Sequence, residues 1–513
     1  MKFDVEYALI EKTGAESERG KGVAAVTETG ADLHPENSTP VSLEWREVIE
    51  LSGADYKVLF KMPSGDALEL SGLGYKYEDF LRIASGFRNN FLIKDALIDE
   101  SDKTFKIEAE YACSDASGKS VRSGPCGIFL YETAVMIIPP AAEFRKLPFR
   151  EISRVSEDGF EFCIVMDSGE TFRLSKFGGG FDYFKKEFFG AINAMNLMSQ
   201  DFIKSVASDT APMESRKASL VLKEGKLISF EKMENACPGF AAALERFISR
   251  DADNAKEFAH LKSLSRREKI CFGFKKGLMG ALSGDYIIVL FPVYAENPSL
   301  PGNAVIMEAF NLGNDGGKTE GGAAKKSAPP AMDKTAVPGT VEFQKQILSM
   351  MSAAASQAGQ AGKPETKGEK RATYFFKLAS RKDYPLTKSI AGLDEKMNVF
   401  LGFFNTAMSA VNFRRAPLFL PDAKLYEPRY VKYRAAAAKI PELRALRDFY
   451  IGRVIHSSYE SWVEDIGNIL AFNVHSSDDS AKWLKSAIGD AGDGEIDNED
   501  IAETENASAQ EKK

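Results

Sequence analysis

The sequence predicts an α+β protein with two tandem β-domains that each end in a helix, a mixed α/β unit and a helical segment. Three observations lead to this prediction. The chain is similar to itself when it is shifted by 104 residues, two helical segments precede three apolar strands over 215–310, and apolar residues recur at helical spacing over 386–476. At about 100–200 residues per domain, the 513 residues allow three or four domains.

The internal repeat aligns residues 1–90 with 105–194 without a gap, and 22 of the 90 pairs are identical. The identical pairs include Glu28 and Glu132, Arg46 and Arg150, Glu47 and Glu151, Gly65 and Gly169, and Gly74 and Gly178. Each copy ends in an apolar stripe of helical spacing, formed by Tyr77, Phe80, Ala84, Phe87 and Phe91 in the first copy and by Phe181, Phe184, Phe188, Ala191 and Met195 in the second. We therefore expect residues 1–95 and 105–198 to share one fold.

Short apolar segments precede each of these helices. Residues 45–51 (WREVIEL) and 149–155 (FREISRV) have the composition of strands, and Ser168-Gly169 marks a tight turn between two further strands. The pattern resembles the pleckstrin-homology superfold, including its GRAM-like bacterial variants. The resemblance implies that each copy is a partially open β-barrel of six or seven strands plugged by a helix. It also implies a recognition domain rather than an enzyme.

The composition of the first hairpin loop in each copy indicates which class of ligand the domain can bind. Phosphoinositide-binding members of the superfold place several lysines and arginines there, because a phosphate needs convergent donors and positive charge. The loop of the first copy holds Lys12 and Arg19 among glutamates, and that of the second has Lys119 and Arg122 as its basic residues. The sequence therefore argues against phosphoinositide binding and favours protein partners.

The chain after the repeat alternates between patterned and unpatterned stretches. Residues 215–310 predict a mixed α/β unit, which a strand at 373–378 completes, so that 371–385 belong to the same unit. The intervening 311–370 are poor in apolar residues and predict a disordered linker. Phe343, Ile347 and Met350 mark a short helix inside that linker, either a marginal helix or one that docks on a partner.

A helical module is expected at 386–476, with helices near 386–411, 423–437, 440–450 and 453–472. Residues 477–513 are rich in acids and predict a disordered acidic tail. The first residues carry charges where a signal peptide needs an apolar core, and no apolar run reaches the length of a membrane span. The five cysteines form no C-x-x-C pair, so we expect a cytoplasmic protein with reduced thiols.

Motifs for catalysis are sparse. The chain has four histidines and no zinc-binding, nucleotide-binding or calcium-binding motif, so we predict no catalytic, metal or cofactor-binding residues and no cofactor. His456 and Glu460 share a helix face if residues 453–472 are helical, an arrangement that is common on protein surfaces. An enzyme with an unrecognised site remains an alternative.

Residues 413–453 form the most basic part of the chain, with ten basic and four acidic residues in a protein of net charge −8. Aromatic residues lie among the charges, which is typical of surfaces that bind nucleic acid or another polyanion. Alternatively, the arginines pair with carboxylates of other domains. The candidate anion- or partner-binding residues are Arg414, Arg415, Arg429, Lys432, Arg434, Arg444, Arg447 and Arg453.

Two functions follow from these patterns. The first is a non-enzymatic scaffold that recognises protein partners through the paired β-domains. The second is a polyanion-binding protein that uses the basic segment. Tandem barrels with an acidic tail also resemble eukaryotic histone chaperones in architecture. A continuous basic groove would favour polyanion binding, whereas mixed surface charge would favour the scaffold.

Overall fold

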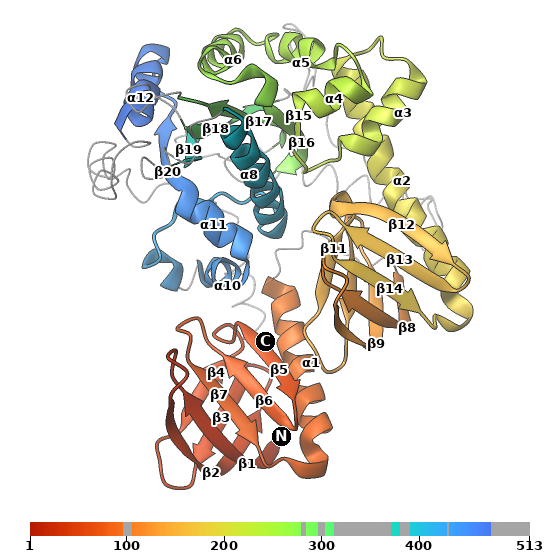
Figure 1. Cartoon of the computed structure of the whole chain (residues 1–513), viewed down its shortest axis with the longest axis vertical. Coiled ribbons are helices and arrows are strands. Elements are labelled where there is room, and N and C mark those ends of the chain that lie inside the picture. Colours follow the sequence, from red (N-terminus) through yellow and green to blue (C-terminus); the bar gives the residue numbers. More distant parts are fainter. Residues whose placement is uncertain are drawn as a thin grey trace, which may run out of the picture.

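The computed structural model describes residues 1–95, 105–278, 284–295, 303–311, 371–379, 390–427 and 430–472. Its strands form three antiparallel sheets, and each sheet is the core of a separate part of the molecule (Figure 1). The first two sheets come from the two copies of the repeat. The third sheet draws strands from residues 228–455 and is covered by helices.

The first two sheets have the same strand order, as the internal repeat predicts. The order is β4-β3-β2-β1-β7-β6-β5 in the first and β11-β10-β9-β8-β14-β13-β12 in the second. The strands of the first are β1 Lys2–Ile10, β2 Glu16–Val26, β3 Gly30–Pro35, β4 Val41–Glu44, β5 Glu50–Ala54, β6 Lys57–Lys61 and β7 Ala67–Ser71. Those of the second are β8 Phe105–Ser114, β9 Ser120–Leu130, β10 Ala134–Ile138, β11 Arg145–Pro148, β12 Ile152–Asp158, β13 Glu161–Met166 and β14 Thr171–Ser175.

Matching glycines confirm the alignment of the two copies. Gly65 and Gly169 adopt φ angles of +93° and +87° in the turns before β7 and β14. Gly74 and Gly178, at the entry to the helix of each copy, adopt +53° and +59°. Residues with a Cβ rarely occupy this region, so the repeat retains glycine where the backbone needs it.

A helix follows each sheet, α1 Tyr77–Asp95 after β7 and α2 Phe181–Val206 after β14. The ring of Phe80 on α1 packs edge-on against Phe3, and Phe184 on α2 packs edge-on against Phe162. Helix α2 is longer than α1, and the side chain of Phe202 near its end stacks on Phe274 in the core of the third sheet. The second copy is therefore joined to the third sheet by a continuous helix.

The repeated Arg-Glu pairs lie before strands rather than inside them. Residues Phe149–Glu151 form a short 3-10 turn, and β12 begins at Ile152. The strand expected over 149–155 thus begins three residues later than predicted. The turn points Arg150 away from its own sheet, because its guanidinium bonds the hydroxyl of Ser409 in the third part of the chain.

The third sheet has the strand order β15-β16-β17-β18-β19-β20. Strand β19 lies between β18 and β20 and pairs antiparallel with both. The prediction that the strand at 373–378 joins the earlier sheet is confirmed, so residues 312–370 are an insertion between neighbouring strands; they lie outside the described residues, as does the tail. The strands are β15 Ile228–Ser229, β16 Cys271–Leu278, β17 Gly284–Val293, β18 Ala304–Asn311, β19 Ala372–Lys377 and β20 Tyr450–Ile455.

Helices cover both faces of the third sheet (Figure 1). On one face lie the end of α2 and the helices α3 Pro212–Val221, α4 Phe230–Ala236, α5 Phe240–Ile248, α6 Ala252–Leu264 and α12 Tyr459–Phe472. On the other face lie α8 Ile390–Ala410, α9 Ala416–Phe419, α10 Val431–Lys439 and α11 Pro441–Phe449. The segment expected as a helical module therefore shares its core with the sheet.

Strand β20 lies where the sequence predicted the start of a helix, so that prediction was wrong. We expected a helix over 453–472, but Tyr450–Ile455 pairs with β19 and α12 begins at Tyr459. The segment YIGRVI is rich in aromatic and β-branched residues, which fit a pleated surface better than a helix. Gly452 pairs with Phe375 next to a register shift between β19 and β20.

Candidate functional site

The described basic side chains of segment 413–453 mostly contact other parts of the same chain. Arg415 donates to the hydroxyl of Tyr374 at 3.0 Å, and the guanidinium of Arg453 lies 4.2 Å from the ring centre of Phe419. Arg447 donates to the carbonyl of Leu420 at 2.8 Å and pairs with Asp422 at 2.7 Å. These arginines hold the segment that follows α8 against the rest of the third part.

The other candidates divide into three groups. Arg434 lies 4.6 Å from the ring centre of Tyr426 and 4.0 Å from a carboxylate oxygen of Glu47 in the first copy. Arg444 donates to the carbonyl of Ala438, and Arg414 is half-buried. Arg429 and the side chain of Lys432 lie outside the described residues. The structure thus brings Arg434 to a carboxylate of another domain, which is the arrangement that the ion-pair interpretation expects.

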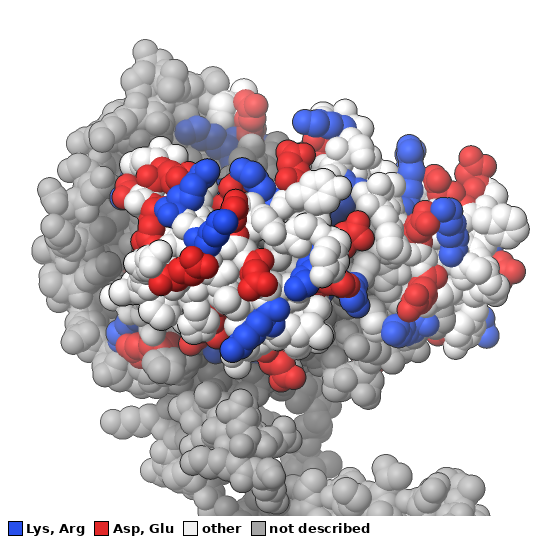
Figure 2. Space-filling view, turned by 90° about the horizontal axis from the view of Figure 1, so that it is seen from below, with Lys and Arg blue, Asp and Glu red and all other residues white. Residues whose placement is uncertain are grey.

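Figure 2 shows basic and acidic side chains interspersed over the lower face of the molecule, and no continuous basic surface crosses the coloured part of that face. No helix in the described ranges is both long and apolar enough to span a bilayer. Within the same ranges, no group of three or more histidine, cysteine, aspartate or glutamate side chains is arranged to hold a metal ion.

A buried polar cluster lies on the face of the third sheet that α6 covers. The two ring nitrogens of His456 lie 3.0 Å from Glu257 on α6 and 3.1 Å from Glu308 on β18. Arg371 pairs with the same two carboxylates at 2.9 and 3.2 Å. Two cations thus balance two carboxylates, as a buried charged group requires.

Contacts within this cluster shift the pKa values of His456 and Glu308. Burial alone would lower the pKa of His456, but its hydrogen bonds to Glu257 and Glu308 outweigh burial and raise the pKa to about 9. Burial alone would raise the pKa of Glu308, but the hydrogen bond and charge of His456, together with Arg371, lower it. Since both nitrogens of His456 are bonded to carboxylates, the cluster acts as a structural connection between α6, β18 and β20.

Sequence reasoning paired His456 with Glu460 on one helix face, which was wrong. His456 follows β20 directly and precedes α12, so the two side chains do not share a helix. The hydroxyl of Thr373 donates to Glu308 at 2.6 Å and accepts from the indole of Trp462 at 2.8 Å. Residues far apart in sequence build this cluster, and local spacing carried no signal for it.

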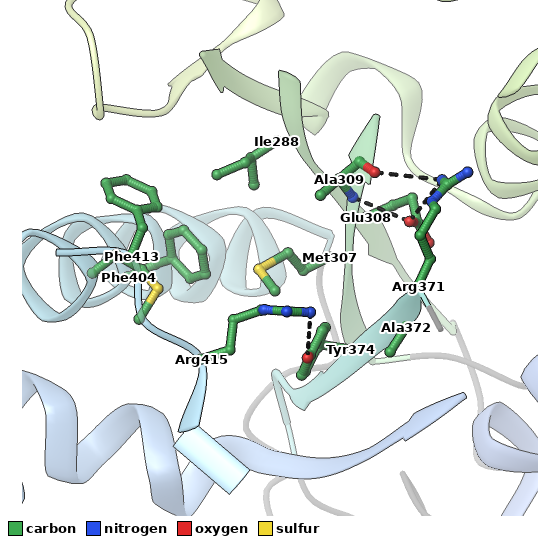
Figure 3. A pocket seen from close by; sticks show the side chains of 11 residues that line it. Ile288, Met307, Glu308, Ala309, Arg371, Ala372, Tyr374, Phe404, Phe413 and Arg415 are labelled. Carbon is green, nitrogen blue, oxygen red and sulfur yellow. Dashed lines mark hydrogen bonds and ion pairs between the residues drawn. The ribbon is translucent and has the colours of Figure 1, made fainter. Parts of the chain in front are cut away.

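A small cavity lies on the opposite face of the sheet (Figure 3). Met307, Tyr374 and Phe404 line it, and its volume of about 20 Å³ admits about one water molecule. Arg371 and Arg415 lie at its polar edges, where the figure shows them bonded to Glu308 and Tyr374. The cavity is too small for a substrate, which needs several hundred Å³.

A larger cleft lies beside α2, between the second copy and the loop before β15. We call it the α2 cleft. Its volume is about 440 Å³, within the range of sites that hold small molecules or peptide side chains. It is lined by the β9–β10 turn, by one face of α2, and by a charged pair from the second copy and the loop before β15. The lining residues are Tyr131, Glu132, Thr133, Arg150, Glu187, Gly190, Ala191, Ala194, Met195, Met198 and Glu224.

The internal repeat explains why this cleft is open. Ala191 occupies the position that Phe87 holds in the first copy, and Met195 corresponds to Phe91. In the first copy Phe87 and Phe91 pack against the barrel core, and the guanidinium of Arg46 lies 4.8 Å from the ring centre of Phe91. Replacing a phenyl ring by a methyl group leaves room along α2.

Arg150 also differs from its counterpart Arg46. Its guanidinium turns away from α2, donates to Ser409 at 3.0 Å and lies 3.8 Å from Glu224. Glu224 in turn accepts from Lys275 at 2.8 Å. Glu224 thus lies between two cations at the base of the cleft, and these contacts join the second copy to the third sheet.

Exposed apolar side chains also occur along α2 and α3. Such exposure is common for single residues; of these side chains Met198 lines the cleft, whereas Phe189 lies about 200° around α2 from Ala191. The fractional exposure of Phe189 is 46% and that of Leu197 is 49%. The group consists of Tyr183, Phe189, Leu197 and Met198 on α2 and Met213 and Leu220 on α3.

Neither a known protein family nor a curated protein sequence matches this chain. The α2 cleft was not among the sites expected from the sequence. The mismatch of Phe87 and Ala191 in the aligned helices was the one signal that could have indicated it.

Proposed function

We propose that this chain is a non-enzymatic scaffold that binds a protein partner in the α2 cleft. The observation that carries the proposal is the cleft itself, which opens in the copy where Ala191 replaces the phenylalanine of its twin. A ready-formed cleft with an apolar wall favours recognition of another protein chain.

The architecture supports the same proposal. Seven antiparallel strands followed by a helix, present twice with one strand order, are what the resemblance to pleckstrin-homology and GRAM-like domains implies. Domains of that kind serve as recognition platforms. We infer that the second copy carries the recognition site and that the first copy stiffens the assembly.

The polyanion hypothesis gains no such support. Arg415, Arg447 and Arg453 bind side chains and carbonyls of their own part of the chain. The cluster around His456 does not favour catalysis either, because its carboxylates and cations are paired with one another.

The test compares Ala191→Phe, which restores the side chain of the first copy, with Asn193→Phe as a matched control. Asn193 is exposed and lies about 200° around α2 from Ala191, at about 100° per residue. Immobilised full-length chains capture proteins from the native cell extract, with and without nuclease treatment.

We expect a defined set of proteins on the wild type and on Asn193→Phe, in both extracts, and its loss from Ala191→Phe. Both variants should melt at the wild-type temperature, since both positions have room for the ring. Retention of the same proteins by Ala191→Phe, or loss of the set after nuclease treatment, would contradict the proposal.

A further inference from the structure

We propose that the occupant of the α2 cleft is an amphipathic helix of a partner protein, with an apolar face and flanking lysine or arginine residues. This inference rests on the proposed function and names the chemistry of its partner. It follows from the length of the cleft, its apolar wall and the charge of its rim.

The cleft follows α2 for about three turns. Its first and last residues on the helix are Glu187 and Met198. At about 1.5 Å per residue this stretch is roughly 16 Å long, which matches three turns of a second helix laid along it. A helix in a groove buries side chains at i, i+3 or i+4 and i+7, the spacing that such a length accommodates.

The wall of the cleft is apolar and adaptable. Ala191 and Ala194 present only methyl groups, and the flexible side chains of Met195 and Met198 close the groove toward the end of the helix. Methionine adjusts to the shape of apolar partners. A phenylalanine or leucine of the partner would take the volume that Phe87 fills in the first copy.

The rim of the cleft is acidic. Glu132 on the β9–β10 turn is exposed, Glu187 on α2 is half-exposed, and neither has an ion pair among the described residues. Arg150, the basic side chain that lines the cleft, lies 3.8 Å from Glu224 and donates to Ser409 at its base. Three carboxylates and one guanidinium line the cleft, so its charge is negative and attracts a cationic helix rather than an acidic one.

The first copy supports this interpretation by contrast. Its residue at the position of Glu187 is Ile83, and the position of Met198 is Lys94. The acidic rim residue Glu187 thus coincides with the open cleft in the second copy, whereas the filled surface of the first copy lacks it. Open space and the carboxylate of Glu187 occur together in the second copy, whereas the other rim acid, Glu132, has its counterpart Glu28 in the first copy.

Three synthetic helical peptides of 16 residues test the inference against the full-length chain. The first has leucine and phenylalanine at i, i+4 and i+7 and lysines on the flanks. The second replaces each lysine by glutamate, and the third keeps the lysines and replaces the apolar face by glutamine. Binding is measured by fluorescence anisotropy at low and at high salt, with the wild type, Ala191→Phe, Glu187→Lys and Asn193→Phe.

We expect the basic amphipathic peptide to bind at least tenfold more tightly than either of the other two at low salt. Ala191→Phe should weaken it at least tenfold, because the ring fills the site. Glu187→Lys should weaken it about fivefold at low salt, an effect that shrinks as salt rises. Asn193→Phe should leave binding within about twofold, since surface changes away from a site have little effect.

Equal binding of the acidic and basic peptides, or equal binding by Ala191→Phe, would overturn the inference. If no peptide binds while Ala191→Phe still loses its captured proteins, the partner chemistry is wrong and the proposed function stands. If Ala191→Phe retains those proteins, the proposed function itself fails.

Discussion

At the scale of single residues, the charge of His456 depends on two carboxylates from elements distant in sequence. Glu257 lies on α6 and Glu308 on β18, and Glu308 is 1% exposed. An uncompensated carboxylate at such a position would be strongly destabilising. Protonated His456 and Arg371 provide the compensation, so the stability of the third sheet should depend on pH.

The substitution His456→Gln tests this dependence. Because the pKa of His456 rises from its ordinary value of 6.5 to about 9 on folding, its protonated form stabilises the native state fully below pH 6.5 and loses this effect as pH rises through 9. The wild type should therefore lose up to about 3 kcal/mol relative to the variant between pH 6.5 and 9.5, since each pKa unit is worth about 1.4 kcal/mol.

Thermal unfolding of both proteins at several pH values provides the measurement. The melting temperature of the wild type should exceed that of His456→Gln most at pH 6.5, and the gap should narrow toward pH 9.5. His34→Gln, at an exposed position, serves as the control. A gap that stays constant over this range would show that His456 does not carry the charge.

At the scale of elements, α1 and α2 show how one repeated helix acquires two roles. On α1, the amide of Asn89 donates to the carbonyl of Ala142 at 2.8 Å and its oxygen accepts from the amide of Phe144 at 3.0 Å. The corresponding Asn193 on α2 is exposed. Helix α1 thus binds the second copy through Asn89. On α2 the equivalent Asn193 faces solvent, and the α2 cleft lies on the other side of that helix.

Strand β19 is the element that connects the chain across the insertion. It lies between β18 and β20, and Phe376 packs against Phe400 of α8. A site-specific protease sequence inserted between residues 320 and 330 should therefore be cleaved without separating the two parts. We expect both fragments to elute together in size-exclusion chromatography in native buffer and to separate in denaturant. Separate elution in native buffer would contradict the pairing of β19 with β18.

At the scale of the whole molecule, one acidic side chain joins all three parts. Glu143, in the loop between β10 and β11 of the second copy, binds Arg88 on α1 of the first copy and Lys439 on α10 of the third part. Arg88 is 1% exposed and also donates to the carbonyl of Val48 at 2.7 Å. Glu143 thus connects the first copy and the third part through the second copy.

Removing Arg88 should release the first copy from this junction. Arg88→Ala leaves Glu143 without its buried partner, and we expect a loss of about 3 kcal/mol. Small-angle X-ray scattering should show a larger radius of gyration, and the melting temperature should fall. Arg82→Ala on the same helix removes an exposed pair with Asp79 and should change stability by less than about 1 kcal/mol. An unchanged radius of gyration for Arg88→Ala would show that this junction does not hold the first copy in place.

The sequence by itself determined the repeat, its glycine turns and most elements of the third sheet. Local pattern suffices for these, because strand and helix periodicity and positive-φ glycines are properties of neighbouring residues. The pairing of β19 with the earlier strands was also predictable, since an apolar strand is stable only as part of a sheet.

Only the tertiary structure decided which charged residues meet and where a cleft opens. The basic segment looked like a polyanion surface, but several of its arginines contact partners such as Glu47 and Tyr374 from other elements. His456 lies between Glu257 and Glu308, which are 199 and 148 residues away. The α2 cleft is lined by α2, by the β9–β10 turn and by Glu224 of the loop before β15, which only the folded chain brings together. Contacts of this kind arise from the packing of distant elements, for which the local pattern carries no information.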